Sequence, residues 1–266
     1  MLPSAEIGVF GGTAFYSFLD DVEEVAVQTP FGSPSAPAAV GSVGGRRVAF
    51  LPRHGAGHGI PAHRVNYRAN LWALRRLGVR RVLAPCSVGS LQPHVRPGDI
   101  VVCDQLVDRT SGRADTFFEG PLPAHVSFAD PYCPELAAVA VDAARAESAT
   151  VHDRGTVVVI QGPRFSTRAE SRWFSSAGWE VVNMTQYPEA VLARELGLCY
   201  SGLALVTDYD AGVERAEAVT METVFRVLAE NIERVKAVLL RAIPAIPADA
   251  GCGCADGAMD PGSLPT

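Results

Sequence analysis

Two carboxylates follow the most apolar segment of the chain. Residues 198–206 read Leu-Cys-Tyr-Ser-Gly-Leu-Ala-Leu-Val, and Thr207-Asp208-Tyr209-Asp210 come directly after them. This hydrophobic run predicts a buried parallel strand, and ligands of open α/β sheets bind at the carboxyl ends of such strands. If the chain stays extended, Asp208 and Asp210 point to one side. There they could accept an amine hydrogen or protonate a ring nitrogen. A helix N-cap or a surface turn is the alternative.

Polar side chains after four other predicted strands suit an anion. They are carried by Gly11-Gly12-Thr13, Pro52-Arg53-His54-Gly55, Cys86-Ser87 and Asn183-Met184-Thr185. Glycine N–H groups and hydroxyls can converge on an anion, the arginine fork matches phosphate oxygens, and His54 could add a second donor. Taken singly, each motif is also compatible with a tight turn, a surface residue or core packing. Cys86 could be a nucleophile, but only with a base that the sequence does not place.

The expected elements alternate between strand and helix along the chain. Apolar periodicity predicts strands at 6–10, 79–84, 99–103, 155–161, 179–182 and 198–206, and helices at 63–77, 134–147, 167–177, 188–196 and 219–243. Residues 22–28 and 37–51 are expected to form β-hairpins, with turn signals at Pro30, Gly32 and Gly44-Gly45. The segment 104–134 is expected to be a long connection with an ordered conformation. This order predicts an α/β fold, a single-domain mixed and mainly parallel sheet wrapped by helices. We expect one domain over residues 1–244 and a flexible Ala/Gly/Pro tail over 245–266.

Composition excludes several classes of protein. The net charge is −6, and no block of basic residues stands out, so neither a nucleic-acid partner nor a membrane partner is expected. No apolar run reaches the length of a membrane span. The first residues carry no basic, signal-type start, which favours a cytoplasmic location. Lys236 is the only lysine, so a P-loop or Schiff-base lysine is not expected elsewhere.

The six cysteines are scattered along the chain. Cys103 and Cys199 fall in apolar strands and are expected to be core thiols. The spacing of the six matches no four-ligand zinc pattern, so no metal site is expected. Cys252-Gly253-Cys254 could form a small strained redox pair. The interpretation favoured here is a reduced pair of thiols in the mobile tail.

Further motifs extend the pattern across the whole predicted domain. They are Gly8-Val9-Phe10-Gly11-Gly12-Thr13, Thr29-Pro30-Phe31-Gly32, Pro52-Arg53-His54-Gly55, Val65-Asn66-Tyr67-Arg68-Ala69-Asn70, Arg96-Pro97-Gly98-Asp99-Ile100-Val101, Gln161-Gly162-Pro163-Arg164-Phe165-Ser166, Asn183-Met184-Thr185 and Thr207-Asp208-Tyr209-Asp210. In number and order they resemble the 5′-methylthioadenosine phosphorylase branch of the trimeric purine nucleoside phosphorylase family. The resemblance runs from the first strand to the last helix.

The resemblance implies that phosphate attacks a nucleoside, releasing a purine and a pentose 1-phosphate. Inorganic phosphate is then a co-substrate, no metal or organic cofactor is required, and the protein is a homotrimer. The implied phosphate-binding residues are Thr13, Arg53, His54, Cys86, Ser87 and Thr185. The implied substrate-binding residues are Phe165 at the base, Met184 at the ribose, and Asp208, Tyr209 and Asp210 at the purine. Ser166 and Met221 would tune specificity, and His125 would reach a neighbouring subunit's 5′ pocket.

The catalytic expectations rest on Asp210 and Asp208. A protonated carboxyl facing N7 would neutralise the departing purine, and burial would raise the pKa of Asp210 for that role. Two aspartates favour a 6-amino purine, and the family resemblance implies S-methyl-5′-thioadenosine as the substrate. A thiol at Cys86 is a weaker donor than a hydroxyl, and the bulk of Met221 could favour a smaller 5′ group. A phosphorylase of 6-oxopurine nucleosides or of 5′-halo- and 5′-deoxyadenosines, a hydrolytic nucleosidase and a silent binding protein are the alternatives.

Overall fold

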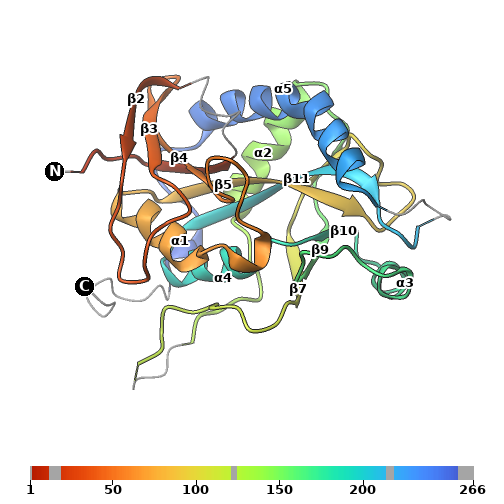
Figure 1. Cartoon of the computed structure of the whole chain (residues 1–266). Coiled ribbons are helices and arrows are strands. Elements are labelled where there is room, and N and C mark those ends of the chain that lie inside the picture. The colour runs from red at the N-terminus through yellow and green to blue at the C-terminus, as the bar shows by residue number, and fades with distance from the viewer. Residues whose placement is uncertain (1, 12–18, 121–124, 214–218, 257–266) are drawn as a thin grey trace.

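One mixed sheet forms the centre of the protein (Figure 1). The structure is a computed structural model that describes residues 2–11, 19–120, 125–213 and 219–256. Its two longest strands are β5 (Arg81–Ser90) and β11 (Cys199–Tyr209), which run parallel to each other. Beside them lie β1 (Ile7–Gly11), β4 (Arg46–Pro52), β6 (Ile100–Val102), β9 (Thr156–Ile160) and β10 (Val181–Asn183). Around these lie β2 (Asp20–Val25), β3 (Ala38–Val43), β7 (Gln105–Arg109) and β8 (Val151–His152).

Strand β5 joins the two halves of the sheet. Its first residues pair in parallel with β1, and its last residues pair antiparallel with β10. From β1 the sheet continues through β4, β3 and β2, and from β10 through β9 to β7. On its other side β5 pairs with β11, which in turn pairs with β6. The ends of β4, β5, β10 and β11 therefore come close together around the middle of the sheet.

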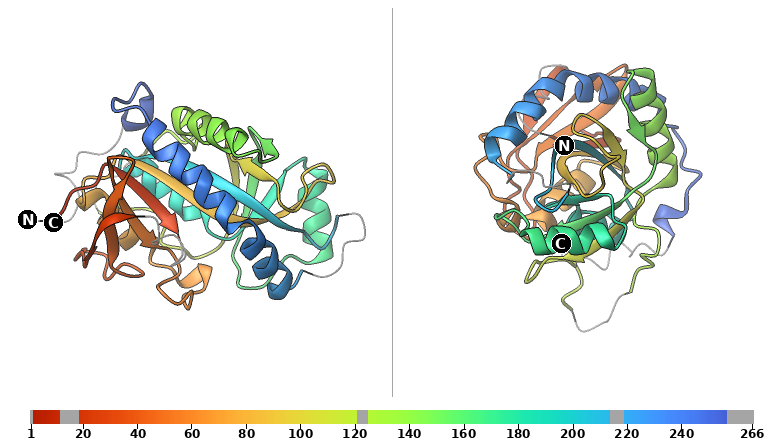
Figure 2. Two further views of the ribbon diagram at one scale, coloured as in Figure 1. Left: turned by 90° about the horizontal axis from the view of Figure 1, so that it is seen from above. Right: turned by 90° about the vertical axis from the view of Figure 1, so that its right-hand side faces the viewer.

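Helices cover both faces of the sheet (Figures 1 and 2). Helices α2 (Pro134–Ala146) and α5 (Met221–Ala245) pack side by side against β11 on one face. Helices α1 (Tyr67–Arg76) and α4 (Gln186–Glu195) pack together on the other, and α1 follows the short helix η2 (Ala62–Arg64). Helix α3 (Arg168–Ser176) lies beyond the β9–β10 edge. The expected α/β architecture is confirmed. No helix within the described ranges is long and apolar enough to cross a bilayer.

Local sequence explains several of the boundaries. The Asn66 side chain accepts a hydrogen bond from the Ala69 N–H and begins α1, so this helix is shorter than predicted. Thr167 and Glu170 form a reciprocal capping box that begins α3 one residue after the predicted start. Gly44 and Gly45 both have positive φ and connect β3 to β4 in the expected hairpin.

Two predicted strand ends are wrong. Strand β5 continues six residues past Ala84, so Cys86 and Ser87 lie inside it. Strand β11 includes Thr207, Asp208 and Tyr209, with a register shift between Val206 and Asp208. Both strands continue into polar sequence because each supplies backbone partners to the other.

The segment after α5 also differs from its prediction. The helix continues through Pro244 to Ala245, and Ile246 behind it is 2% exposed. The short helix η3 (Gly253–Ala255) follows and buries Cys254. Residues 245–256 thus continue from α5 into η3 on the α2/α5 side, and the mobility expected of the tail stays a prediction. Residues 257–266 are outside the described ranges.

Candidate active site

A cavity of about 550 Å³ opens where the strand ends meet. Its wall contains most of the residues singled out in the sequence: Arg53, His54, Cys86, Ser87, Phe165, Ser166, Met184, Thr185, Asp208, Asp210 and Met221. These come from β4, β5, β10, β11, α5 and the loops beside them. Thr13 is among the predicted site residues but lies outside the described residues.

Tyr209, which is among the predicted substrate-binding residues, does not line the cavity. Side chains alternate along a strand, so Tyr209 points away from the face that carries Asp208 and Asp210. Its hydroxyl lies 3.5 Å from the Pro93 carbonyl, outside the cavity wall. His125 is exposed and does not line this cavity either.

Arg53 lies at one end of the cavity in a buried ion pair. Its Nε and Nη2 donate to the two carboxylate oxygens of Glu189 at 2.6 and 2.9 Å, and Nη1 donates to the Pro85 carbonyl. Arg53 is 5% exposed and Glu189 is fully buried. Burial opposes the charge on Arg53, but the charge and hydrogen bonds of Glu189 outweigh it and raise the pKa of Arg53. A guanidinium has five N–H donors, so two remain for an anion in the cavity.

Glu189 and Tyr200 complete this end of the site, and the sequence did not indicate either. The Tyr200 hydroxyl donates to Glu189 at 2.8 Å, so the carboxylate that fixes Arg53 is itself held in place. Glu189 is 136 residues from Arg53 in the chain. No local pattern predicts such a pair. A buried glutamate in an apolar helix is the only signal, and burial is known only from the fold.

His54 takes a different role from the donor expected of it. Its Nδ1 lies 2.8 Å from the Ile60 carbonyl, which can only accept, so Nδ1 carries the hydrogen. Burial, followed by the positive charge of Arg53, lowers the pKa of His54 to about 4. The ring is therefore neutral near pH 7, and Nε2 is an acceptor. In this protonation state it can receive the P–OH hydrogen of a monoprotonated phosphate.

Cys86 is a thiol rather than a nucleophile in this environment. Burial raises the pKa of Cys86 to about 11, although nearby Arg53 acts in the opposite direction. The Gln186 side chain donates to its sulfur at 3.3 Å. A protonated thiol is a poor nucleophile, so this environment disfavours the nucleophilic alternative. The thiol hydrogen remains a weak donor toward the cavity.

Asn183 orients Thr185 at the same end of the cavity. Its side-chain oxygen accepts from the Thr185 N–H at 2.6 Å and lies 3.3 Å from the Thr185 hydroxyl. Its side-chain nitrogen donates to the Ser87 carbonyl on β5. This amide thus ties the end of β10 to β5 and fixes the hydroxyl-bearing residues relative to one another.

The two predicted acids lie together at another part of the wall. Asp208 is 8% exposed and accepts from the Thr207 hydroxyl at 2.8 Å. Burial raises the pKa of Asp208 to about 6, against the Thr207 hydrogen bond and with added repulsion from Asp210. A Cβ at Gly89 would lie 3.0 Å from Asp208 Oδ1, so glycine lets the carboxyl lie against β5.

Asp210 is 2% exposed, and its Oδ2 has no hydrogen-bond partner among the described residues. Burial raises the pKa of Asp210, with the Ser171 hydroxyl acting in the opposite direction. The buried hydroxyl of Ser166 on the same wall also acts to lower that pKa, although it makes no hydrogen bond of good geometry to a described residue. A buried polar atom without a partner is costly, so a ligand that bonds Asp210 and Ser166 would gain stability from both.

The remaining wall is apolar. Phe165 and Met184 lie on the β9–β10 side, and α5 contributes Met221, Phe225 and Ile232. Met221 and Phe225 are 49% and 48% exposed, which is unusual for large apolar side chains. The cavity thus joins a cationic end, an acidic group and an apolar wall. It can hold an anion, a nitrogen heterocycle and a nonpolar substituent together.

Asp208 should make the ligand-free protein less stable as pH rises. Its folded pKa of about 6 exceeds the value of about 3.9 for an unfolded aspartate. The folded protein therefore has the full stability that protonated Asp208 allows below about pH 4. It loses this stability as the pH rises through 6 and the buried carboxyl ionises. Two pKa units correspond to roughly 3 kcal/mol. We expect Asp208→Asn, which does not ionise, to raise Tm over the parent protein far more at about pH 7.5 than at about pH 4. A Tm difference independent of pH would contradict this.

Comparison with known proteins shows which family shares these features. The family model described as the phosphorylase superfamily matches residues 6–244. A purine nucleoside phosphorylase of Streptomyces coelicolor is 57% identical over 97% of this chain and 96% of its own length. An S-methyl-5′-thioadenosine phosphorylase of Mycolicibacterium smegmatis is 57% identical over 92% of this chain and 93% of its own.

A solved structure of a methylthioadenosine phosphorylase has the same fold as this chain. Methylthioadenosine phosphorylase from Schistosoma mansoni, in complex with adenine, superimposes with a TM-score of 0.87 and 39% identity, over 93% of each chain. Identity at this level over nearly the whole chain extends the similarity from fold to family.

Proposed function

Because this chain belongs to the phosphorylase superfamily and is a pentosyltransferase, we propose that it acts on S-methyl-5′-thioadenosine. Inorganic phosphate converts this nucleoside to adenine and 5-methylthioribose 1-phosphate, a step of purine and methionine salvage. The observation that carries the proposal is the single cavity that joins Arg53 at one end to Asp208 and Asp210 elsewhere on its wall. The reaction needs no organic cofactor, since phosphate is itself the second substrate.

The acids handle the leaving purine. As the bond between C1′ and N9 breaks, its electrons move into the purine ring, and negative charge grows there. The protonated Asp210 carboxyl donates its hydrogen to N7, while Asp208 accepts from the 6-amino group. Burial favours the protonated form that this role requires. Ser166 lies beside these acids on the cavity wall and is suited to a further contact with the base.

The cationic end holds the attacking phosphate. The two remaining N–H groups of Arg53 donate to its oxygens, with the Ser87 and Thr185 hydroxyls and the Cys86 thiol beside them. His54 Nε2 accepts the P–OH hydrogen of the monoprotonated ion. Thr13 stays part of this proposal on its sequence position alone. One phosphate oxygen then bonds to C1′, so this set of residues mainly positions two reactants.

The apolar part of the wall suits the 5′ substituent. In this proposal Met184 contacts the ribose and Phe165 faces the base. Met221, Phe225 and Ile232 would surround a methylthio group, which has no hydrogen-bond donor. A 5′-hydroxyl placed there would lose its water partners without replacement. This supports a methylthio group over the hydroxyl of adenosine.

A series of nucleosides tests the substrate. We expect kcat/KM to be highest for S-methyl-5′-thioadenosine, lower for 5′-halo- and 5′-deoxyadenosines and for adenosine, and lowest for inosine. A preference for inosine would instead make this a 6-oxopurine phosphorylase. The 57% identity to a relative named as a purine nucleoside phosphorylase keeps that function as a second candidate. Initial rates of base release, measured by absorbance at saturating phosphate, distinguish the two.

We also propose that the chain assembles into an oligomer with subunit contacts near the cavity. The exposed side chains of Met221 and Phe225 at the cavity wall suit contact with a neighbouring subunit, and His125 is exposed for a similar contact. We therefore expect a homotrimer, and sedimentation equilibrium should give the mass of three chains. We place this homotrimer in the cytoplasm. A monomer with full activity would contradict this arrangement.

A further inference from the structure

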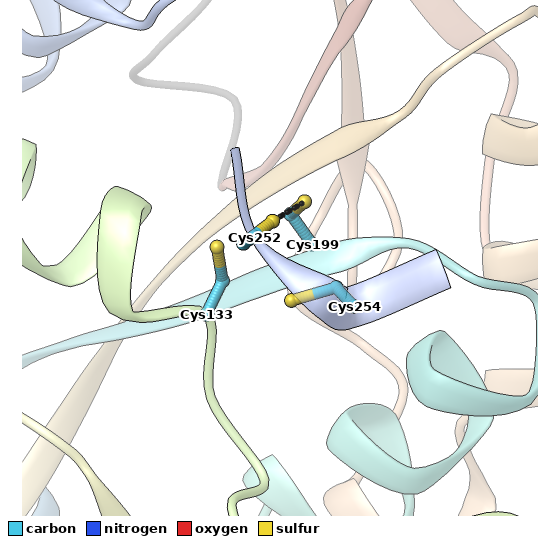
Figure 3. A group of neighbouring side chains, drawn as sticks. All are labelled: Cys133, Cys199, Cys252 and Cys254. Atoms are coloured by element: carbon cyan, nitrogen blue, oxygen red, sulfur yellow. Dashed lines mark hydrogen bonds between the residues drawn. The ribbon is translucent and has the colours of Figure 1, made fainter. Parts of the chain in front are cut away.

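Four cysteines meet at the end of β11 opposite the acids (Figure 3). Cys133 is the N-cap residue of α2, Cys199 is the first residue of β11, and Cys252 and Cys254 lie at and within η3. Their four sulfur atoms all lie within 4.8 Å of one another, and those of Cys199 and Cys252 are 3.4 Å apart. Three segments far apart in the sequence thus direct thiols at one point.

The surroundings hold these thiols in place. Cys133, Cys199 and Cys254 are 1%, 5% and 4% exposed, and all three belong to the core between the sheet and the α2/α5 layer. Glu135 on α2 accepts from the Gly251 N–H at 2.7 Å, just before Cys252. Arg46 donates to the Ile246 carbonyl at 2.6 Å. The segment that carries Cys252 and Cys254 is therefore held by hydrogen bonds on both sides of residues 247–250.

The geometry suits a tetrahedral metal ion. Zinc binds thiolate sulfur at about 2.3 Å, which places the sulfur atoms of a tetrahedron about 3.8 Å apart. The observed separations, 3.4 Å for one pair and at most 4.8 Å for all, bracket that value. Thiolates in a tetrahedral set favour zinc over the oxygen-seeking cations. We propose that Cys133, Cys199, Cys252 and Cys254 bind a structural Zn²⁺ ion.

Binding is an acid–base step with no change of oxidation state. Four S–Zn bonds form, up to four thiol protons leave to solvent, and zinc remains Zn²⁺. Cys133 is the N-cap residue of α2, so the positive end of that helix lies beside its sulfur and favours a thiolate there.

The site is structural rather than catalytic. Four protein ligands fill a tetrahedral zinc and leave no position for substrate. Cys199 and Asp208 lie nine residues apart on the extended β11, a separation of about 30 Å. The ion would instead fasten the segment after α5 to α2 and β11. The sequence pattern missed it because the ligands come from three separated segments, and only the fold unites them.

Metal content of the full-length protein tests the site directly. The protein is reduced, stripped with a chelator and then given Zn²⁺ alone or Co²⁺ alone. Native mass spectrometry should find one zinc per chain. The cobalt form should show sulfur-to-metal charge transfer and the visible bands of a tetrahedral tetrathiolate. A reduced protein that takes up no stoichiometric zinc, or cobalt without these bands, would overturn the proposal.

Variants identify the ligands. The double variant Cys252→Ser/Cys254→Ser should lose the zinc and the cobalt bands but keep its rate of phosphorolysis, which shows that it folds. Removing zinc should lower the Tm of the parent protein and leave that of the double variant unchanged. Cys103→Ser removes a buried thiol outside the cluster and should keep one zinc per chain. Loss of the cobalt bands in Cys103→Ser, or their survival in the double variant, would overturn the assignment.

Disulfides are the competing fate of these thiols. After denaturation without a reductant, freshly purified protein should accept alkylating reagent at all six cysteines. Disulfide bonds within the cluster would instead lower the mass by two or four hydrogens and block those cysteines. Finding the cluster oxidised in this way would contradict a zinc site.

Discussion

Asp210→Asn should lower kcat for S-methyl-5′-thioadenosine by about 10²–10⁴-fold, the usual contribution of a positioned general acid. An amide still donates a hydrogen bond but cannot transfer a proton to N7, so charge on the leaving purine stays uncompensated. The rate on inosine should fall by a similar factor, because Asp210 acts at N7, which both purines have, whereas the 6-substituent faces Asp208. Steady-state kinetics on both nucleosides measure these effects.

Tyr209→Phe provides the matched control for that variant. Tyr209 is the neighbour of Asp210 on the chain, but it points away from the cavity. We expect its kcat and KM to stay close to those of the parent protein. Unchanged kcat in Asp210→Asn would remove Asp210 from the role of acid. Asp208, whose pKa is also raised by burial, would then be the remaining candidate.

Arg53→Met should weaken both phosphate use and folding. Two charged hydrogen bonds to phosphate are worth about 1.5–3 kcal/mol each, so kcat/KM for phosphate should fall by about 10²-fold or more. The change also leaves Glu189 buried without its partner. Breaking a buried pair in this way costs about 3–5 kcal/mol of stability. Phosphate titrations and urea unfolding measure the two losses separately.

The double variant Arg53→Met/Glu189→Leu separates binding from folding. It removes both buried charges, so most of the stability lost in Arg53→Met should return. Phosphate use should not return, because no guanidinium faces the cavity. If the double variant recovered phosphate-dependent turnover, Arg53 would act only as structural support for Glu189.

Apolar patterning predicted the order of elements well because the residue types within each segment indicate which of its side chains are buried. It placed the strand ending near Asp208, the hairpin at Gly44-Gly45 and the capped helix α3. It misjudged the ends of β5 and β11 because strand length depends on pairing partners. Polar residues after Ala84 and Val206 look like loop until the neighbouring strand is known.

The parts of the site that the sequence did not reveal depend on contacts between distant segments. Glu189 fixes Arg53 across 136 residues, and Gln186 reaches Cys86 across 100. The tautomer of His54 could not be predicted, because the carbonyl that selects it, that of Ile60, is brought to the ring only by the folded loop. The cysteine cluster was missed for the same reason.

In the proposed mechanism, phosphate and nucleoside react with each other within one cavity. The most direct measurement follows ³²P-labelled phosphate and S-methyl-5′-thioadenosine in a single turnover with enzyme in excess. We predict that adenine appears only when phosphate is present and that one label enters the sugar product for each adenine released. Adenine release at the same rate without phosphate, with a free sugar as product, would show hydrolysis and contradict the account.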